Sequence, residues 1–175
     1  MKNINVKKGI MYLSGEDFYL FCYAVIITLD SLKCNDGKYF KDYRKLAFII
    51  DFIKDERLVY ILNNLDSESH NNIDKEYLFN SYSNGLTRRS EVLKLLFTLE
   101  KKGFISLEKG NISSLVNVSL NKKNLPKTFF DKKVFGKEYN NLNSLKTNIK
   151  RLSTLTLDTM LGKIYRERGI KTWVI

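Results

Sequence analysis

The amino-acid sequence predicts a mainly helical fold with one small antiparallel β-hairpin. Proline, which breaks helices and strands, occurs once in 175 residues, at Pro126. Residues 87–103 show helical spacing of apolar side chains, with one face formed by Val92, Leu95, Leu96 and Leu99. Two extended runs, 104–107 and 112–120, follow this helix and indicate the hairpin. A hydrophobic content of 43% is enough to build a sizeable core.

The first third of the chain is expected to form three helices. The first begins at Ser14, where Ser-Gly-Glu-Asp is typical of a helix start, and continues to about Leu32. It is apolar nearly all round, so we expect it to be buried in a core or at a partner interface. After a turn at 34–37, residues 39–65 carry two apolar stripes separated by a charged break at 54–56. This pattern favours two short helices over one long helix.

The middle of the chain is expected to hold a short helix, a longer helix and the hairpin. A polar loop covers 66–72, and Asp74 can cap a short helix that the polar stretch 81–85 then breaks. Thr87 can cap the next helix, which ends with two lysines and a glycine. Gly110-Asn111 suits a tight hairpin turn. The order helix, helix, turn, helix, hairpin is that of a winged helix, a module that binds DNA or proteins and rarely performs chemistry.

The chain divides into a winged-helix-like region with its N-terminal helices, residues 1–120, and a basic C-terminal region, residues 121–175. Residues 121–136 have weak periodicity and are expected to form a linker or crossing segment. Two helical faces follow, one at Leu142, Leu145, Ile149 and Leu152 and one at Leu157, Met160, Leu161 and Ile164. Gly169 suits the end of the second helix. The apolar tail holds the only tryptophan, Trp173, and is expected to dock against another surface.

Positive charge is concentrated in the last third of the chain. The formal net charge is +11, of which residues 120–175 contribute +9 and residues 1–119 only +2. Such a block attracts phosphates or an acidic partner. Lysine outnumbers arginine by 23 to 7, however, and abundant lysine, asparagine and isoleucine are also what an AT-rich genome produces. Both interpretations of the basic region stay open.

The cysteines and the N-terminal sequence predict a cytoplasmic protein with reduced thiols. No signal peptide precedes Cys22 and Cys34, the only two cysteines. The apolar run 18–29 is too short to span a bilayer. Cys22 lies within this run, so we expect it to be a small core residue.

No catalytic or cofactor-binding pattern stands out in the sequence. His70 is the only histidine and lies in a polar loop, so we expect a solvated side chain and not a general base. No cluster has metal-ligand spacing, and the glycines do not form a phosphate-binding loop. The neighbouring acidic residues Asp51, Asp55 and Glu56 are accounted for by the break between two helices. The sequence therefore predicts no catalysis, no cofactor and no metal.

The helix before the hairpin can be interpreted as a DNA reader or as an ordinary solvated helix. Its predicted outward face includes Arg88, Arg89 and Lys94, and the two arginines are placed for base-edge or phosphate contacts. Glu91 lies beside them and would repel phosphate. A second candidate nucleic-acid surface lies in the C-terminal region and consists of Lys146, Lys150 and Arg151.

Four stretches resemble a family of small bacterial proteins. Residues 45–62 (KLAFIIDFIKDERLVYIL) have a basic residue, an apolar run with Phe, a polar break and a leucine-rich turn. Residues 77–82 (YLFNSY) and the step 103–105 (GFI) follow in the order that the family shows. The close of the chain, residues 148–173, resembles the family's terminal helix and apolar tail. On these motifs the chain resembles the small middle components of three-component ABC/SMC systems, including the small subunit of Lamassu-type anti-phage defence.

The resemblance implies a non-catalytic accessory subunit that docks on an SMC-like ATPase and helps hold or gate an effector in anti-phage or anti-plasmid defence. Apolar contacts to the ATPase would come from Phe104, Trp173 and Val174, and double-stranded DNA is a possible further partner. A different interpretation is a free-standing winged-helix transcriptional regulator, a symmetric dimer that reads DNA with Arg88 and Arg89. A small nuclease or other enzyme is a third idea, for which the sequence offers no active site.

Overall fold

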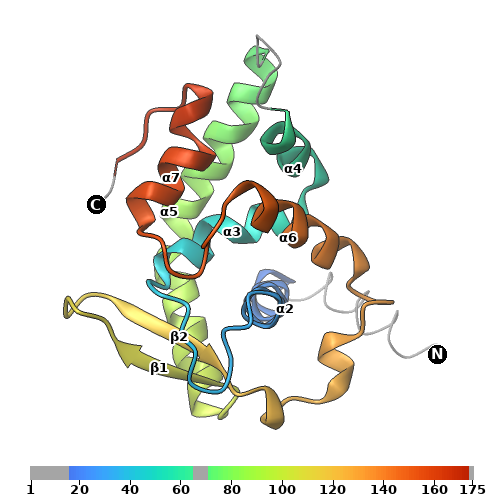
Figure 1. Ribbon diagram of the computed structural model, residues 1–175, viewed down its shortest axis with the longest axis vertical. Coiled ribbons are helices and arrows are strands. Elements are labelled where there is room, and N and C mark those ends of the chain that lie inside the picture. Colours follow the sequence, from blue (N-terminus) through green and yellow to red (C-terminus); the bar gives the residue numbers. More distant parts are fainter. Residues whose placement is uncertain (1–15, 65–70, 174–175) are drawn as a thin grey trace.

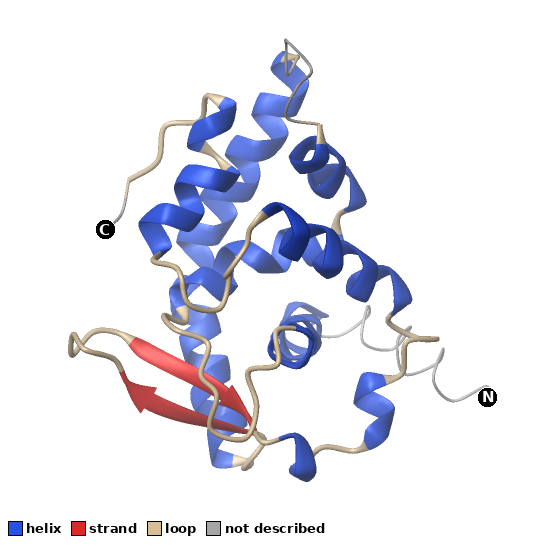
Figure 2. Cartoon of the chain, in the orientation of Figure 1, coloured by secondary structure: helices blue, strands red, loops and turns tan. Residues whose placement is uncertain are grey.

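The computed structural model describes residues 16–64 and 71–173, with side chains from residue 18 onward. Within these residues the chain is mainly helical with one two-stranded antiparallel sheet, which confirms the predicted fold class (Figures 1 and 2). The elements are α2 (Glu16–Ser31), α3 (Arg44–Lys54), α4 (Glu56–Asn63), α5 (Asn72–Lys101), β1 (Ile105–Lys109), β2 (Val116–Leu120), η1 (Lys122–Asn124), η2 (Lys127–Phe130), α6 (Gly136–Asn148), α7 (Leu157–Ile164) and η3 (Arg166–Arg168).

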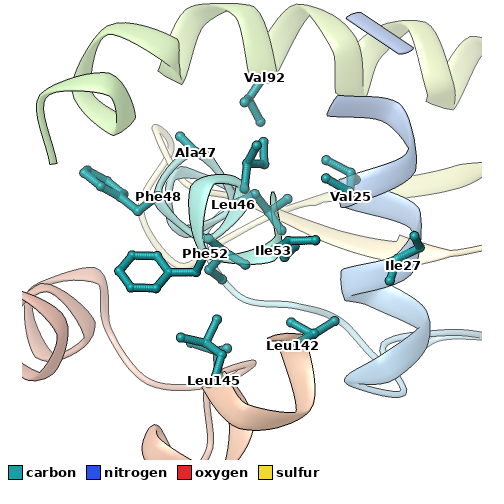
Figure 3. Packing of buried hydrophobic residues seen from close by; sticks show 14 of the residues in the cluster. Val25, Ile27, Leu46, Ala47, Phe48, Phe52, Ile53, Val92, Leu142 and Leu145 are labelled. Carbon is teal, nitrogen blue, oxygen red and sulfur yellow. The ribbon is translucent and has the colours of Figure 1, made fainter. Parts of the chain in front are cut away.

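Helix α3 lies at the centre of the core, with α5 packed on one side and α6 on the other. Figure 3 shows Leu46 and Ile53 of α3 between Val92 of α5 and Leu142 of α6. Eight of the eleven residues of α3 are buried, because α2 and α7 also pack against it. The apolar run of α3 is therefore covered by other helices of the same chain.

The predicted division of residues 39–65 into two short helices is confirmed. Helix α3 ends at Lys54, and Asp55 adopts an extended backbone conformation with φ −118° and ψ 107°. The Asp55 carboxylate accepts a hydrogen bond from the Arg57 backbone N–H at 2.8 Å, so it caps α4. The charged break thus ends one helix and begins the next.

The predicted break at residues 81–85 is wrong, because α5 runs through it without interruption. The N-terminal cap is Asn71, whose side chain accepts from the Asp74 backbone N–H, while the Thr87 hydroxyl donates to the Asn84 carbonyl and caps nothing. A Cβ on Gly85 would lie 2.2 Å from Cδ1 of Phe48. Gly85 is therefore a site of close helix contact, where α3 and α5 approach too closely for a side chain.

The hairpin is confirmed, but its loop is longer than the predicted two-residue turn. Strands β1 and β2 pair antiparallel with Ile105 opposite Leu120, and residues 110–115 connect them. The Gly110 N–H donates to the Leu115 carbonyl at 2.8 Å, which closes a six-residue loop in place of a turn at 110–111. The segment after α2 lies along β2, and Phe40 exchanges backbone hydrogen bonds with Val118. This contact covers one edge of the hairpin.

The two predicted C-terminal helical faces are confirmed as α6, α7 and the residues that follow α6. Their apolar side chains, Leu142, Leu145, Met160 and Leu161 among them, belong to the same hydrophobic cluster as α2, α3 and α5. The boundary near residue 120 therefore does not divide the core. Between β2 and α6 the chain forms the short helices η1 and η2, and Gly169 ends η3 with φ +81°. Cys22 and Cys34 are both free and buried, which confirms the core position of Cys22.

Several predicted features lie outside the described residues, namely Ser14, most of the polar loop with His70, and Val174. Among the helices that the structure describes, none is long and apolar enough to cross a membrane. The same residues contain no group of three or more His, Cys, Asp and Glu side chains that could hold a metal ion.

Candidate functional site

Arg88 does not face outward, so that part of the predicted DNA-reading face is wrong. Its Nη1 atom lies 2.7 Å from Oδ1 of Asp51 on α3, and the two side chains are only 13% and 12% exposed. The Arg88 guanidinium also lies 5.0 Å from the centre of the Phe21 ring. Arg88 therefore joins α5 to α3 and α2. The sequence signal was the single carboxylate of Asp51 inside an otherwise apolar run, which needs an internal partner.

Arg89 is also turned toward the core. Its guanidinium carbon lies 5.4 Å from the centre of the Phe48 ring, and burial lowers the pKa of the Arg89 side chain. The two arginines thus contribute to the packing of α5. Of the three predicted contacts on this helix, only Lys94 lies on its exposed face.

The second predicted nucleic-acid surface is divided in the same way. Nζ of Lys146 donates to the backbone carbonyl of Ser31 at 2.9 Å, at the C-terminal end of α2. A cation there is favourable because the last carbonyls of a helix carry partial negative charge. Lys150 and Arg151 are exposed at the turn between α6 and α7, where Arg151 has φ +61°.

A buried lysine that sequence reasoning missed lies beneath this turn. Lys45 of α3 is fully buried, and its Nζ donates to the carbonyls of Leu152, Ser153 and Leu155 at 2.8, 3.3 and 2.8 Å. The ammonium also lies 4.4 Å from the centre of the Phe40 ring, and burial lowers the pKa of Lys45 to about 8. Lys45 therefore fixes the turn before α7 to the central helix. No pattern in the sequence distinguishes it from a solvated lysine.

The tail carries an exposed tryptophan, Trp173, whose main chain is fixed. The Trp173 backbone N–H donates to Oη of Tyr82 at 2.7 Å, and the Tyr82 hydroxyl donates to the Trp173 carbonyl at 3.0 Å. The two rings are tilted with centroids 6.5 Å apart, and the Trp173 side chain is 60% exposed. Tyr82 itself is buried in α5. The tail is thus docked through its backbone while the indole is presented outward.

The two other predicted partner contacts differ from Trp173. Phe104 is partly buried against the core, and its N–H donates to the Leu99 carbonyl at the end of α5. Val174 lies outside the described residues. Large exposed apolar side chains instead occur near the start of α5, on both α4 and α5, at Tyr60, Ile73, Tyr77 and Phe79.

A groove of about 370 Å³ lies between the α3–α4 joint and α5, and its acidic residues are both engaged. Asp51 forms the ion pair with Arg88, and Asp55 caps α4. Paired carboxylates perform acid–base chemistry only when one of them is available to a substrate. The groove therefore supplies no ready acid–base pair.

Comparison with family models, with curated proteins and with solved structures gave no match for this chain.

Proposed function

We propose that this chain is a non-catalytic accessory subunit that docks on an SMC-like ATPase in a cytoplasmic defence complex and helps hold or gate its effector. The observation that carries the proposal is Trp173, an exposed indole on a backbone that Tyr82 fixes at both its N–H and its carbonyl. A large aromatic side chain presented from an ordered backbone is typical of an interface hot spot, because little conformational entropy is lost on binding.

The engagement of the carboxylates agrees with a subunit that does not turn over a substrate. Asp51 and Asp55 line the groove, and each is already bound within the chain. The motifs at residues 45–62 and 77–82 resemble those of ABC/SMC middle components, and the helices that carry them form the core and hold Tyr82 in place. The proposal thus combines the resemblance with an anchored aromatic side chain.

The free-standing DNA-binding regulator is less well supported. That interpretation relies on Arg88 and Arg89 as base-reading residues, and Arg88 is instead ion-paired with Asp51. A neighbouring gene for an SMC-like ATPase is expected under our proposal. A lone operon with a promoter palindrome would favour the regulator.

The bench test is co-purification with the SMC-like ATPase encoded beside this chain. We expect Trp173→Ala to reduce the ATPase recovered by at least about tenfold, the typical loss on truncating an interface hot spot. The matched control is Phe97→Ala, which removes a 50%-exposed aromatic side chain from the C-terminal half of α5. Tyr82, which holds Trp173, lies in the N-terminal half of this helix. Equal recovery with both variants, at unchanged circular dichroism, would contradict the role of Trp173.

A further inference from the structure

Within the described residues, exposed lysines are concentrated in one segment at the start of the predicted basic C-terminal region. Residues 121–137, which we call the basic strap, contain six lysines and one acidic residue. All six lysine side chains are exposed, namely Lys122, Lys123, Lys127, Lys132, Lys133 and Lys137. In Figure 1 the strap is the gold and orange stretch that curves around α2 from the end of β2 to the start of α6.

The strap is held against the protein by its apolar residues. Phe129 stacks on Tyr23 of α2 with ring centroids 5.1 Å apart, and Phe135 lies 4.8 Å from the same ring. Leu125 and Phe135 are buried. The lysines are therefore displayed from a backbone that packing has already ordered, which reduces the entropy lost when a ligand binds.

The positive surface continues onto the C-terminal end of α5. The side-chain amides of Asn121 and Asn124 donate to the Gly103 carbonyl at 3.1 and 2.7 Å, which joins the strap to this helix end. Lys101 and Lys102 are exposed at the same end. The helix-end carbonyls of Thr98, Leu99 and Glu100 accept from the backbone N–H groups of the three residues that follow α5, so they are satisfied next to the lysines.

The acidic side chains near the strap are engaged in hydrogen bonds within the chain. Asp30 accepts from Nζ of Lys122 at 2.6 Å and from the Tyr139 hydroxyl at 3.0 Å. Asp131 accepts from the Lys133 backbone N–H at 2.8 Å, and Glu100 accepts from the Leu107 N–H at 3.1 Å. Among the strap lysines, Lys122 pairs with Asp30 at 2.6 Å, and Lys137 lies 3.8 Å from the exposed carboxylate of Glu56. The other four form no ion pair with a described residue, so their charge faces solvent.

We propose that the basic strap, together with Lys101 and Lys102, binds the phosphate backbone of duplex DNA without reading its sequence. Lysine acts on phosphate as a point charge, and the strap contains no arginine that could form a bidentate contact to a guanine edge. No strap residue is among the large exposed apolar side chains in the described part of the chain. Protein interfaces need such apolar anchors, whereas phosphate binding does not. This partner goes beyond the proposed function, since it requires neither the ATPase nor an effector.

The test is fluorescence anisotropy of the full-length chain with a labelled mixed-sequence DNA duplex, titrated at several salt concentrations. The strap variant is K101Q/K123Q/K127Q/K133Q. The matched control is K38Q/K75Q/K109Q/K171Q, which removes the same number of charges from exposed lysines elsewhere. We expect the strap variant to weaken binding at least about tenfold at low salt and to reduce the slope of log K against log salt by about 3.6, since each of the four removed phosphate contacts contributes about 0.9. The control should lose less than about threefold.

Each other outcome overturns the proposal. Equal loss in the two variants would mean that net charge alone drives binding. Loss confined to K94Q/K150Q/R151Q would place the contact on the surface predicted from the sequence. Binding of polyglutamate without binding of the duplex would indicate an acidic protein partner. Thermal melting of each variant controls for folding, and the smaller change K123E/K127E repeats the test if the quadruple variant melts early. Trp173 is unchanged in these variants. A negative result for DNA binding would therefore overturn this proposal without affecting the co-purification test of the proposed function.

Discussion

The basic strap and the residues that follow it, 138–173, are both rich in cationic side chains but use them differently. The strap lysines are exposed. Beyond the strap, Lys146 donates to the last carbonyl of α2, and buried Arg168 donates to the Leu62 carbonyl in α4 at 2.8 Å. Arg166 forms an ion pair with Asp158 at 2.7 Å. One region presents its positive charge to solvent, and the other uses much of it to join helices.

The first half of the chain contributes cations of the second kind. Lys45 reaches from α3 to three carbonyls of the α6–α7 turn, and Arg88 reaches from α5 to Asp51. Carbonyls at helix ends and turns lack partners within their own helix, so a long cationic side chain can satisfy them. A count of net charge therefore overstates the positively charged surface that is available to a polyanion.

The largest expected effect is the loss of Lys45. Replacing it with Met keeps the apolar stem but removes the Nζ donor from the carbonyls of Leu152 and Leu155, while the Ser153 carbonyl keeps the Lys41 N–H. We expect Lys45→Met to lower the free energy of unfolding by about 3–5 kcal/mol, measured by urea denaturation. The matched change Lys94→Met, on an exposed lysine, should alter it by less than about 0.5 kcal/mol.

If the two methionine variants lost similar free energies of unfolding, Lys45 would be no more structural than an exposed lysine. The distinction between internal and exposed cations would then be wrong. Limited proteolysis provides a second measurement of the difference between the two variants. We expect cleavage near Arg151 to become faster in Lys45→Met and to stay unchanged in Lys94→Met, since only the former releases the turn.

The short helices could be predicted from the sequence because their patterns are local. Stripes of apolar residues predict α3, α4, α6 and α7. The polar residue Asp55 indicates the break between α3 and α4. The continuity of α5 could not be predicted. Its Ser-Asn-Gly stretch favours a turn, but Gly85 packs on Phe48, and Ser81 hydrogen-bonds to Tyr165 at 3.0 Å. Those contacts come from residues 37 and 84 positions away.

Docking of the tail could be predicted because an apolar terminal segment indicates it whichever residue the partner is, but the partner itself could not be predicted. The apolar tail indicated docking, and Trp173 is docked through Tyr82. Cationic residues gave no such signal, because Lys45 and Lys123 look alike in the sequence although one is buried and the other exposed. Whether a cation is internal depends on which carbonyls and carboxylates the fold brings to it.

The next largest effect concerns the ion pair between Arg88 and Asp51. Arg88→Met should lower the free energy of unfolding by about 1–3 kcal/mol, because the mostly buried carboxylate loses its close cation. The double variant D51N/R88M should recover part of that loss. A coupling energy of about 1 kcal/mol or more in the double-mutant cycle would support an internal role for Arg88. A coupling energy near zero, together with weaker DNA binding by Arg88→Met, would mean that Arg88 contacts DNA from the surface.

The smallest effect is the pH dependence that Lys45 confers. Burial lowers its pKa from 10.5 to about 8, so between these values the native chain has released a proton that the unfolded chain still holds. The unfolded state then binds more protons, and the stability contributed by Lys45 rises as the pH increases from about 8 toward 10.5. We expect the stability difference between Lys45 and Lys45→Met to widen in favour of lysine by about 1 kcal/mol between about pH 7 and about pH 9.

Both chains should carry Cys34→Ser, because the Cys34 thiol interacts with Lys45 and burial raises the pKa of this thiol. The other buried thiol, Cys22, has its pKa raised to about 12 by burial, and its opposite effect on stability cancels between the two chains. A difference that stays constant up to about pH 9 would show that the three carbonyls keep Lys45 charged. In that case Lys45 stays charged in its buried site, and it differs from the exposed lysines of the strap in its partners.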